Sequence, residues 1–162
     1  MKETPEYHTV VVTVLNRIGV TARVTSLLSA LGYNIESVIA APTENYDIYK
    51  IHIGLIATER ETEQLVKQLH KLIDTLKVSD ISHKNNYIVR EFMIMKVHTG
   101  KNRAEIFSLC EAFRAKLVDV EQNHVVIDFS GPVKKVERFI DLMKPYGITE
   151  LVRSGRVAMS ES

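Results

Sequence analysis

Two short stretches carry the residues best suited to binding a small molecule. The first is a turn at residues 16–19 that ends in glycine and leads into an amphipathic segment. Such a turn exposes unpaired backbone N–H groups at a helix N-terminus, where a small carboxylate can bind. The second begins at Asn34, whose side-chain amide has both a donor and an acceptor for a carboxylate and an ammonium group. With the apolar Ile18, Val20 and Ile35 nearby, these residues would suit a free aliphatic amino acid.

A purely structural interpretation of the turn is equally open, since asparagine and glycine are common wherever the backbone bends sharply. Catalysis has less support. The sequence contains no paired nucleophile and base, no phosphate loop and no metal-ligand spacing, and its histidines show no close i, i+4 pairing. Cys110, the single cysteine, falls on an apolar helical face and is predicted to pack as a small hydrophobe. We therefore predict no catalytic residue, no metal site and no cofactor on this chain.

The elements around the turn follow from the hydrophobic pattern. Residues 10–15 form an apolar run rich in β-branched side chains, which predicts a strand. From Val20 to Leu31 apolar residues recur at helical spacing, and Gly32 is expected to end the helix. A second strand is predicted over residues 33–41.

Two more strands and a helix complete the first half of the chain. Alternating apolar residues predict a strand over residues 48–56. Thr58 and Glu61 have capping-box spacing ahead of a helix whose apolar side is expected to run as far as Leu76, and residues 78–82 form a short closing strand. The order is β-α-β-β-α-β in about 80 residues, the ferredoxin-like arrangement.

The second half is predicted to repeat this order. The expected elements are strands at 87–98, 116–121 and 124–130, helices around 106–113 and 132–143, and final strand material at 148–152 and 157–159, with residues 153–156 interpreted as an exposed turn. The predicted class is α+β, with two tandem βαββαβ ferredoxin-like domains. We place the first domain at residues 1–82 and the second at residues 83–162.

One consequence of this fold is an uncovered sheet. Two helices cover only one face of a four-stranded sheet, so the other face and the edge strand need a partner or polar residues. The predicted second strand carries apolar residues on both faces, among them Ile35, Val38 and Ile39. We therefore expect this strand to lie in an interface between two copies of the chain, forming a homodimer.

Composition and charge argue against several other classes of function. The formal net charge of +1 gives no electrostatic basis for binding nucleic acid or a membrane. An RNA-binding module with this strand order would need a basic strand with paired aromatic residues, and none occurs. No apolar run approaches the roughly 18–20 residues of a membrane span. The first residues, MKETPEYH, lack the apolar core of a secretory signal, so we expect a cytoplasmic protein.

Four segments of the chain resemble the small, regulatory subunit of acetolactate synthase (acetohydroxyacid synthase), the first of them its N-terminal ACT domain. The segments are LNRIGVTARVTSLLSALGYNIESVIAAPTE, EQLVKQLHKLIDTLKVSDIS, VREFMIMKV and ELVRSGRVAMS. GYNIES followed by AP is the most specific part. The segments occur in the family's order, and the resemblance extends over essentially the whole chain.

This resemblance implies a non-catalytic subunit that binds and activates a larger catalytic subunit and confers feedback inhibition by valine. The sequence leaves open whether leucine or isoleucine competes with valine. Thiamine diphosphate, magnesium and FAD would belong to the large subunit. The ACT domains would pair as a homodimer, with valine between the turn and first helix of one protomer and the second strand of the other. Leu15 and Thr21 depart from the family's common acidic residue and leucine, which bears on effector preference. The implied effector-binding residues are Asn16, Arg17, Ile18, Gly19, Val20, Thr21, Asn34 and Ile35.

Overall fold

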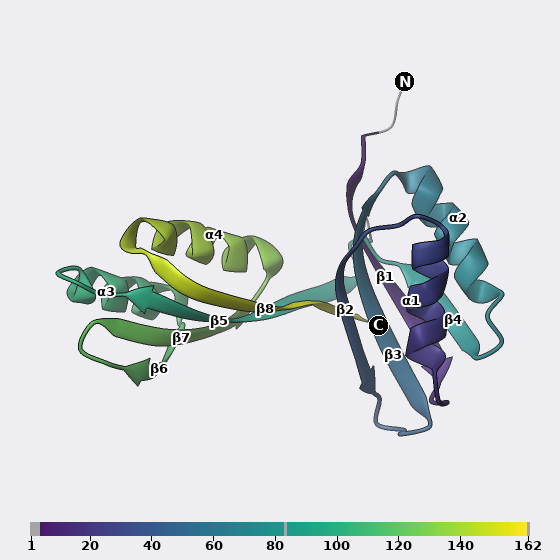
Figure 1. The fold of residues 1–162 in the computed structure, drawn as a ribbon, viewed down its shortest axis with the longest axis horizontal. Helices are drawn as coiled ribbons and strands as arrows, with labels where there is room; N and C mark the ends of the chain where they lie inside the picture. Colours follow the sequence, from purple (N-terminus) through teal and green to yellow (C-terminus); the bar gives the residue numbers. More distant parts are fainter. Residues whose placement is uncertain (1–3, 83, 162) are drawn as a thin grey trace. The chain divides into compact units, whose positions relative to one another are not determined.

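The computed structural model describes residues 4–82 and 84–161 and contains two four-stranded sheets. The first sheet has the order β2-β3-β1-β4 and carries two helices on one face (Figure 1); its elements are β1 (Glu6–Leu15), α1 (Val20–Ala30), β2 (Ile35–Pro42), β3 (Ile48–Ala57), α2 (Glu59–His70) and β4 (Thr75–Asp80). The second sheet has the order β6-β7-β5-β8; its elements are β5 (Tyr87–His98), α3 (Arg103–Phe113), β6 (Lys116–Val120), β7 (His124–Gly131), α4 (Val133–Met143), the 3-10 helix η1 (Lys144–Tyr146) and β8 (Ile148–Ser160). The predicted α+β class with two βαββαβ repeats is confirmed.

The contacts within the chain define two compact units. One unit comprises Met1–Ile88 together with Gly155–Ser162, and the other comprises Val89–Ser154. The C-terminal end of β8 therefore belongs with the first unit, although the start of the strand belongs to the second. The division into domains at residues 82 and 83 stays a prediction.

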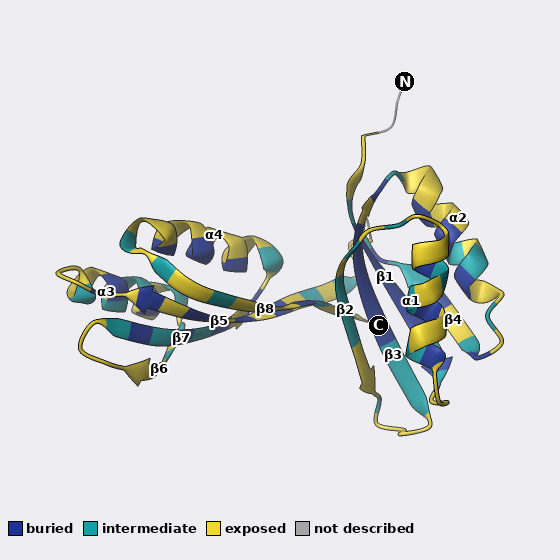
Figure 2. Ribbon diagram, viewed as in Figure 1, coloured by how far each residue is buried: buried dark blue, intermediate teal, exposed yellow. Residues whose placement is uncertain are grey.

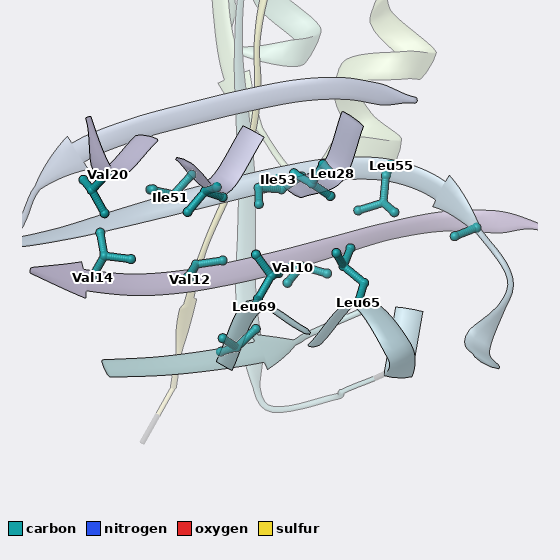
Figure 3. Packing of buried hydrophobic residues seen from close by; sticks show 13 residues of the cluster. Val10, Val12, Val14, Val20, Leu28, Ile51, Ile53, Leu55, Leu65 and Leu69 are labelled. Atoms are coloured by element: carbon teal, nitrogen blue, oxygen red, sulfur yellow. The ribbon is translucent and has the colours of Figure 1, made fainter. Parts of the chain in front are cut away.

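The core of the first unit lies between its sheet and its two helices. Alternate residues of the central strands point toward the helices (Figure 3); they include Val10, Val12, Val14, Ile51, Ile53 and Leu55, all fully buried. Helical spacing brings Val20, Val24 and Leu28 of α1 onto the face that meets them. Figure 2 shows the resulting pattern, in which each helix has one buried and one exposed side.

The predicted capping box at the start of α2 is confirmed. Glu61 N donates to Thr58 Oγ1 (3.3 Å), and Thr58 N donates to the Glu61 carboxylate (2.8 Å). The expected end of this helix is wrong, because α2 stops at His70 and leaves Ile73 and Leu76 outside it, 86% and 51% exposed. Their apolar character alone predicted a longer helix. In the structure Ile73 lies in the connection after α2, and Leu76 belongs to β4.

The second unit has a separate core between its sheet and α3 and α4. Its largest buried side chains come from alternate residues of β5 and β7 and from the helices, among them Met93, Met95, Ile127, Phe139 and Met143. Cys110 lies in this cluster, and burial raises the pKa of its thiol to about 11. The prediction that this cysteine packs as a hydrophobe is confirmed.

The expected exposed turn at residues 153–156 is wrong, because these residues continue β8 as a single strand. Arg153 makes two hydrogen bonds, of 2.7 and 2.8 Å, to the carboxylate of Glu91, which is 3% exposed. Gly155 is buried and has a φ of +84°, a conformation that glycine adopts without steric cost. The glycine and charged residues that predicted a turn thus form part of a strand, in which Arg153 is paired with Glu91.

From Gly155 onward, β8 lies against the face of the first sheet that the helices leave uncovered. His52 Nε2 hydrogen-bonds the carbonyl of Ala158 (3.0 Å), and the guanidinium of Arg156 stacks 3.6 Å from the centroid of the Tyr7 ring. Residues of this face are consequently buried, including Thr9 (5% exposed) and Val11 (9%). The end of β8 therefore packs on the second face of the sheet, and the sheet keeps two edge strands, β2 and β4.

This packing predicts a pH dependence of stability. Burial lowers the pKa of His52 below its ordinary value of 6.5; the hydrogen bond to Ala158 opposes this in part, and the charge of Lys50 adds a smaller lowering. Below about pH 6.5, His52 is therefore protonated in the unfolded chain but not in the folded one. The free energy of unfolding decreases as the pH is lowered from there, until the lowered pKa of the folded state is passed.

We expect the free energy of unfolding, measured by denaturant titration between about pH 5 and 8, to fall toward the acidic end. The variant His52→Gln keeps an N–H donor and does not titrate, so its slope should be shallower. Identical slopes for the two proteins would contradict this assignment.

Candidate functional site

Hydrogen bonds to two other loops fix the turn between β1 and α1. Asn16 Nδ2 donates to the Tyr46 carbonyl (2.9 Å), and Asn16 N donates to the Asp47 carbonyl (2.8 Å). Leu15 N donates to the Asp74 carbonyl (2.8 Å). The side-chain amide of Asn16 thus has a structural role, which agrees with the structural interpretation of the turn, and one of its two N–H groups is used in it.

The helix that follows the turn begins without a cap. Gly19 occupies the N-cap position with a φ of +81°, its missing side chain supplies no hydrogen bond, and the first turn of α1 contains no acidic residue. In α2, by contrast, Thr58 caps the helix and Glu59 and Glu61 lie in the first turn. The N-terminus of α1 therefore has unused hydrogen-bonding capacity and a positive partial charge, the two features that favour a bound carboxylate.

Two arginines add to this positive charge. Arg23 donates to the carboxylate of Asp74 (2.6 Å) and, through its other terminal nitrogen, to the Ile18 carbonyl (3.3 Å). Arg17 lies 3.4 Å from the same carboxylate and is 64% exposed. Asp74 is 3% exposed and carries one negative charge against two positive ones. Neither Arg23 nor Asp74 was predicted from the sequence, where an isolated aspartate between apolar residues gives no signal of such a role.

The predicted site residues fall into two groups. The turn and the start of α1 form one group; within it Val20 is buried, Thr21 is partly buried, and Asn16, Arg17, Ile18 and Gly19 are exposed. The other group consists of Asn34, which is exposed and precedes β2, and Ile35, which is partly buried at the start of that strand. Among the large apolar residues that the structure describes, Ile18 is the most exposed, and it projects from the turn with no described neighbour covering it.

One chain does not bring the two groups together. Leu15, next to the turn, pairs with Ile48 on β3, whereas Ile35 pairs with Leu55, seven residues further along the same strand. At roughly 3.3 Å per residue, the groups are separated by about 23 Å along the sheet. They therefore lie at opposite ends of the first sheet, as the two ends of α1 do in Figure 1.

Comparison with known proteins identifies the family. Residues 10–77 match the family described as the AHAS small subunit-like ACT domain, and residues 90–162 match the small subunit of acetolactate synthase. A probable acetolactate synthase small subunit of Archaeoglobus fulgidus is 43% identical over 153 residues, which cover 94% of this chain and 95% of that protein. The chain belongs to the acetolactate synthase small-subunit family. The resemblance found in the sequence is confirmed.

Two further relatives agree with this assignment. The acetolactate synthase small subunit of Bacillus subtilis is 40% identical over 153 residues, covering 93% of this small subunit and 88% of its relative. The crystal structure of the small subunit from Thermotoga maritima superimposes with a TM-score of 0.85 at 33% identity, covering 96% and 97% of the two chains. The small subunit therefore shares both domains, and their fold, with this solved relative.

No helix within residues 4–82 and 84–161 has the length and apolar character needed to cross a membrane. Over the same part of the chain, no three histidine, cysteine or acidic side chains come together in a group that could hold a metal ion.

Proposed function

We propose that this small subunit is a non-catalytic regulator in branched-chain amino acid biosynthesis. It binds and activates the cytoplasmic large subunit of acetolactate synthase and makes that enzyme sensitive to inhibition by valine. Effector binding belongs to the ACT domain at residues 1–82, and residues 83–162 form the C-terminal domain. The observation that carries the proposal is the uncapped N-terminus of α1 beside Arg17 and Arg23.

The open edge of the sheet supports a homodimer. β2 has β3 as a neighbour on one side only, and it presents eight residues without lysine. Such an edge is a template for pairing with a second strand. When two β2 strands pair antiparallel about a twofold axis, the start of each strand lies beside the end of the other. Asn34 of one protomer then approaches the turn of its partner, and the pairing closes the gap of about 23 Å along the sheet.

The pocket formed in this way would suit valine. The carboxylate would accept hydrogen bonds from the first-turn amides of α1 after Gly19, and the ammonium group would meet the Asn34 side chain from the partner. Ile18, Val20 and Ile35 would enclose a short aliphatic side chain. Leucine and isoleucine differ from valine by one methylene, a difference worth about 1–3 kcal/mol in an apolar pocket, so they are weaker alternatives.

Inhibition then follows from linkage between ligand and conformation. Valine bound across two protomers favours the dimer geometry that encloses it, and the enzyme is inhibited if that geometry supports catalysis poorly. A coupling of about 1–3 kcal/mol gives ordinary feedback control. Thiamine diphosphate, magnesium and FAD are placed on the large subunit, which supplies the chemistry, whereas this chain supplies the regulatory site.

Reconstitution with a catalytic large subunit tests the proposal. Acetolactate formation from pyruvate should be absent with the small subunit alone, should increase several-fold when it is added to the large subunit, and should fall when valine is added to the complex. Sedimentation of the small subunit should give twice the chain mass of 18.4 kDa. Pyruvate turnover by the small subunit alone, or no effect on the large subunit, would contradict the proposal.

A further inference from the structure

A second site lies on the face of the first sheet opposite the helices. A cavity of about 140 Å³ is bounded there by β1, β3 and β4, by Tyr87, and by Ala158–Ser160 at the end of β8. All of these segments belong to the first unit. The cavity lies near the same end of the sheet as the turn, since Thr13 is two residues from Leu15, but its polar side chains carry hydroxyl and ammonium groups.

The two ammonium groups belong to one row of the sheet. Thr13 on β1 pairs with Lys50 on β3 and with Lys77 on β4, so the three side chains project from the same face. At roughly 4.8 Å between neighbouring strands, the backbones of the two lysines are about 10 Å apart. Both long side chains line the same cavity, and they can therefore converge on one group between them.

No acidic residue lies beside this pair in the lining of the cavity. None of the residues that line the cavity is acidic, and neither Lys50 nor Lys77 forms an ion pair with another described residue. Val11, which is 9% exposed, forms the apolar base of the cavity between the two lysines. Two like charges facing one partly enclosed space repel each other, and an anion placed between them would replace repulsion with attraction.

The hydroxyl groups indicate which anion fits. In addition to the two lysines, four hydroxyl-bearing residues line the cavity: Thr13, Ser79, Tyr87 and Ser160. A carboxylate has two oxygens and one charge, whereas a phosphate has more acceptor oxygens and close to two charges near neutral pH. The cavity volume admits one phosphate group and leaves no room for a nucleotide.

We infer that this cavity binds a phosphate dianion, either as the free ion or as the terminal group of a small phosphate ester, between Lys50 and Lys77. The bound anion would join three strands of the sheet to the end of β8. It would thereby stabilise the packing of the C-terminal residues on the sheet. This inference is independent of the proposed valine site, because it shares no residue with it.

Calorimetric titration of the full chain with inorganic phosphate, at constant ionic strength in chloride, tests the inference. We expect saturable binding with a dissociation constant on the order of 1 mM. Lys50→Gln and Lys77→Gln should each weaken binding about tenfold or more, which corresponds to about 1.4 kcal/mol. Lys71→Gln is the matched control, since Lys71 is exposed at the end of α2 and the variant loses the same charge.

A parallel titration with glycerol 3-phosphate distinguishes the two sources of phosphate. Binding of the free ion alone would assign the site to inorganic phosphate, and equal binding of the ester would assign it to a phosphorylated metabolite. Phosphate should also raise the melting temperature of the wild-type chain and of Lys71→Gln, but not that of Lys50→Gln. Absence of saturable binding, or equal loss in the Lys71 variant, would overturn the inference.

Discussion

Replacing Gly155 with alanine should destabilise the first unit strongly, although the change adds only one methyl group. A Cβ at this position would lie 2.7 Å from Ser37 Cβ and 3.3 Å from Ile39 Cδ1, and both of these residues belong to β2. The φ of +84° adds a second cost, because side chains with a Cβ rarely adopt that conformation. The two effects act together at a buried position, and the nearer neighbour, Ser37 Cβ, is fixed to the backbone of β2 and cannot rotate away.

The two costs can be separated with Gly32. This glycine has nearly the same φ, +82°, and lies in the same unit, but a Cβ there would have no atom within 4 Å. Gly32→Ala should therefore show the conformational cost alone, about 1–2 kcal/mol. Gly155→Ala should show that cost plus about 1–3 kcal/mol from overpacking.

Denaturant titration of both variants gives the comparison as a difference in the free energy of unfolding of the first unit. Hydrogen exchange should also show faster exchange of the amides around Ser37 in Gly155→Ala, because the end of β8 would be pushed away from β2. If Gly155→Ala costs no more than Gly32→Ala, the end of β8 does not pack on the sheet as described.

The periodicity of apolar residues was sufficient to predict the repeated βαββαβ order. Helical spacing between Val20 and Leu28 and the capping box at Thr58 are local signals, since they depend on residues within a few positions of one another. The end of α2 shows the limit of this approach. Ile73 and Leu76 fit a helical face, but a residue can be apolar and exposed, and the pattern does not record which surface it meets.

The packing of the C-terminal residues depends on contacts that no local pattern contains. Gly155 and Arg156 resemble a turn because glycine and arginine are common in exposed loops. Their structural partners are Ser37 and Tyr7, more than a hundred residues earlier in the chain. Asp74 was missed for the same reason, because its two arginine partners are more than fifty residues away.

The candidate site was predicted in its parts but not in its arrangement. The turn at Gly19 is a local feature and could be recognised from the sequence. The separation of Asn34 from that turn follows from the register of β1, β2 and β3, which is a property of the whole sheet. The sheet order, with β2 at an edge, then explains why a second protomer is needed to complete the proposed pocket.

The second large effect is expected for Gly19→Asp, which should abolish valine binding. A Cβ at Gly19 would point to Arg23 Nη1, at 3.3 Å, so the new carboxylate would lie beside the guanidinium and the first turn of α1. It would occupy the position proposed for the carboxylate of valine and would repel that group. We expect affinity to fall roughly a hundredfold or more, at least about 3 kcal/mol, in calorimetric titration.

Gly100→Asp provides the matched control for this variant. Gly100 lies in the turn before α3, also has a positive φ (+46°), and is exposed, so the same charge enters the equivalent turn of the second repeat. Valine binding should be unchanged in Gly100→Asp. Equal losses in the two variants would show that the effect is a general one on folding or charge, and valine binding to Gly19→Asp with undiminished affinity would remove the site from this turn.

A mixed dimer tests whether the pocket lies between two protomers. In a dimer of Gly19→Asp chains neither turn is intact, and in a dimer of Asn34→Ala chains both Asn34 side-chain amides are missing. Neither dimer should therefore bind valine well. A heterodimer of the two variants has one site in which both defects coincide and one in which the turn and the amide are both intact. It should therefore bind one valine with wild-type affinity, whereas the wild-type dimer binds two. A heterodimer that binds none, although the wild type binds two, would place both halves of the pocket in a single chain, which the separation of about 23 Å along the sheet opposes.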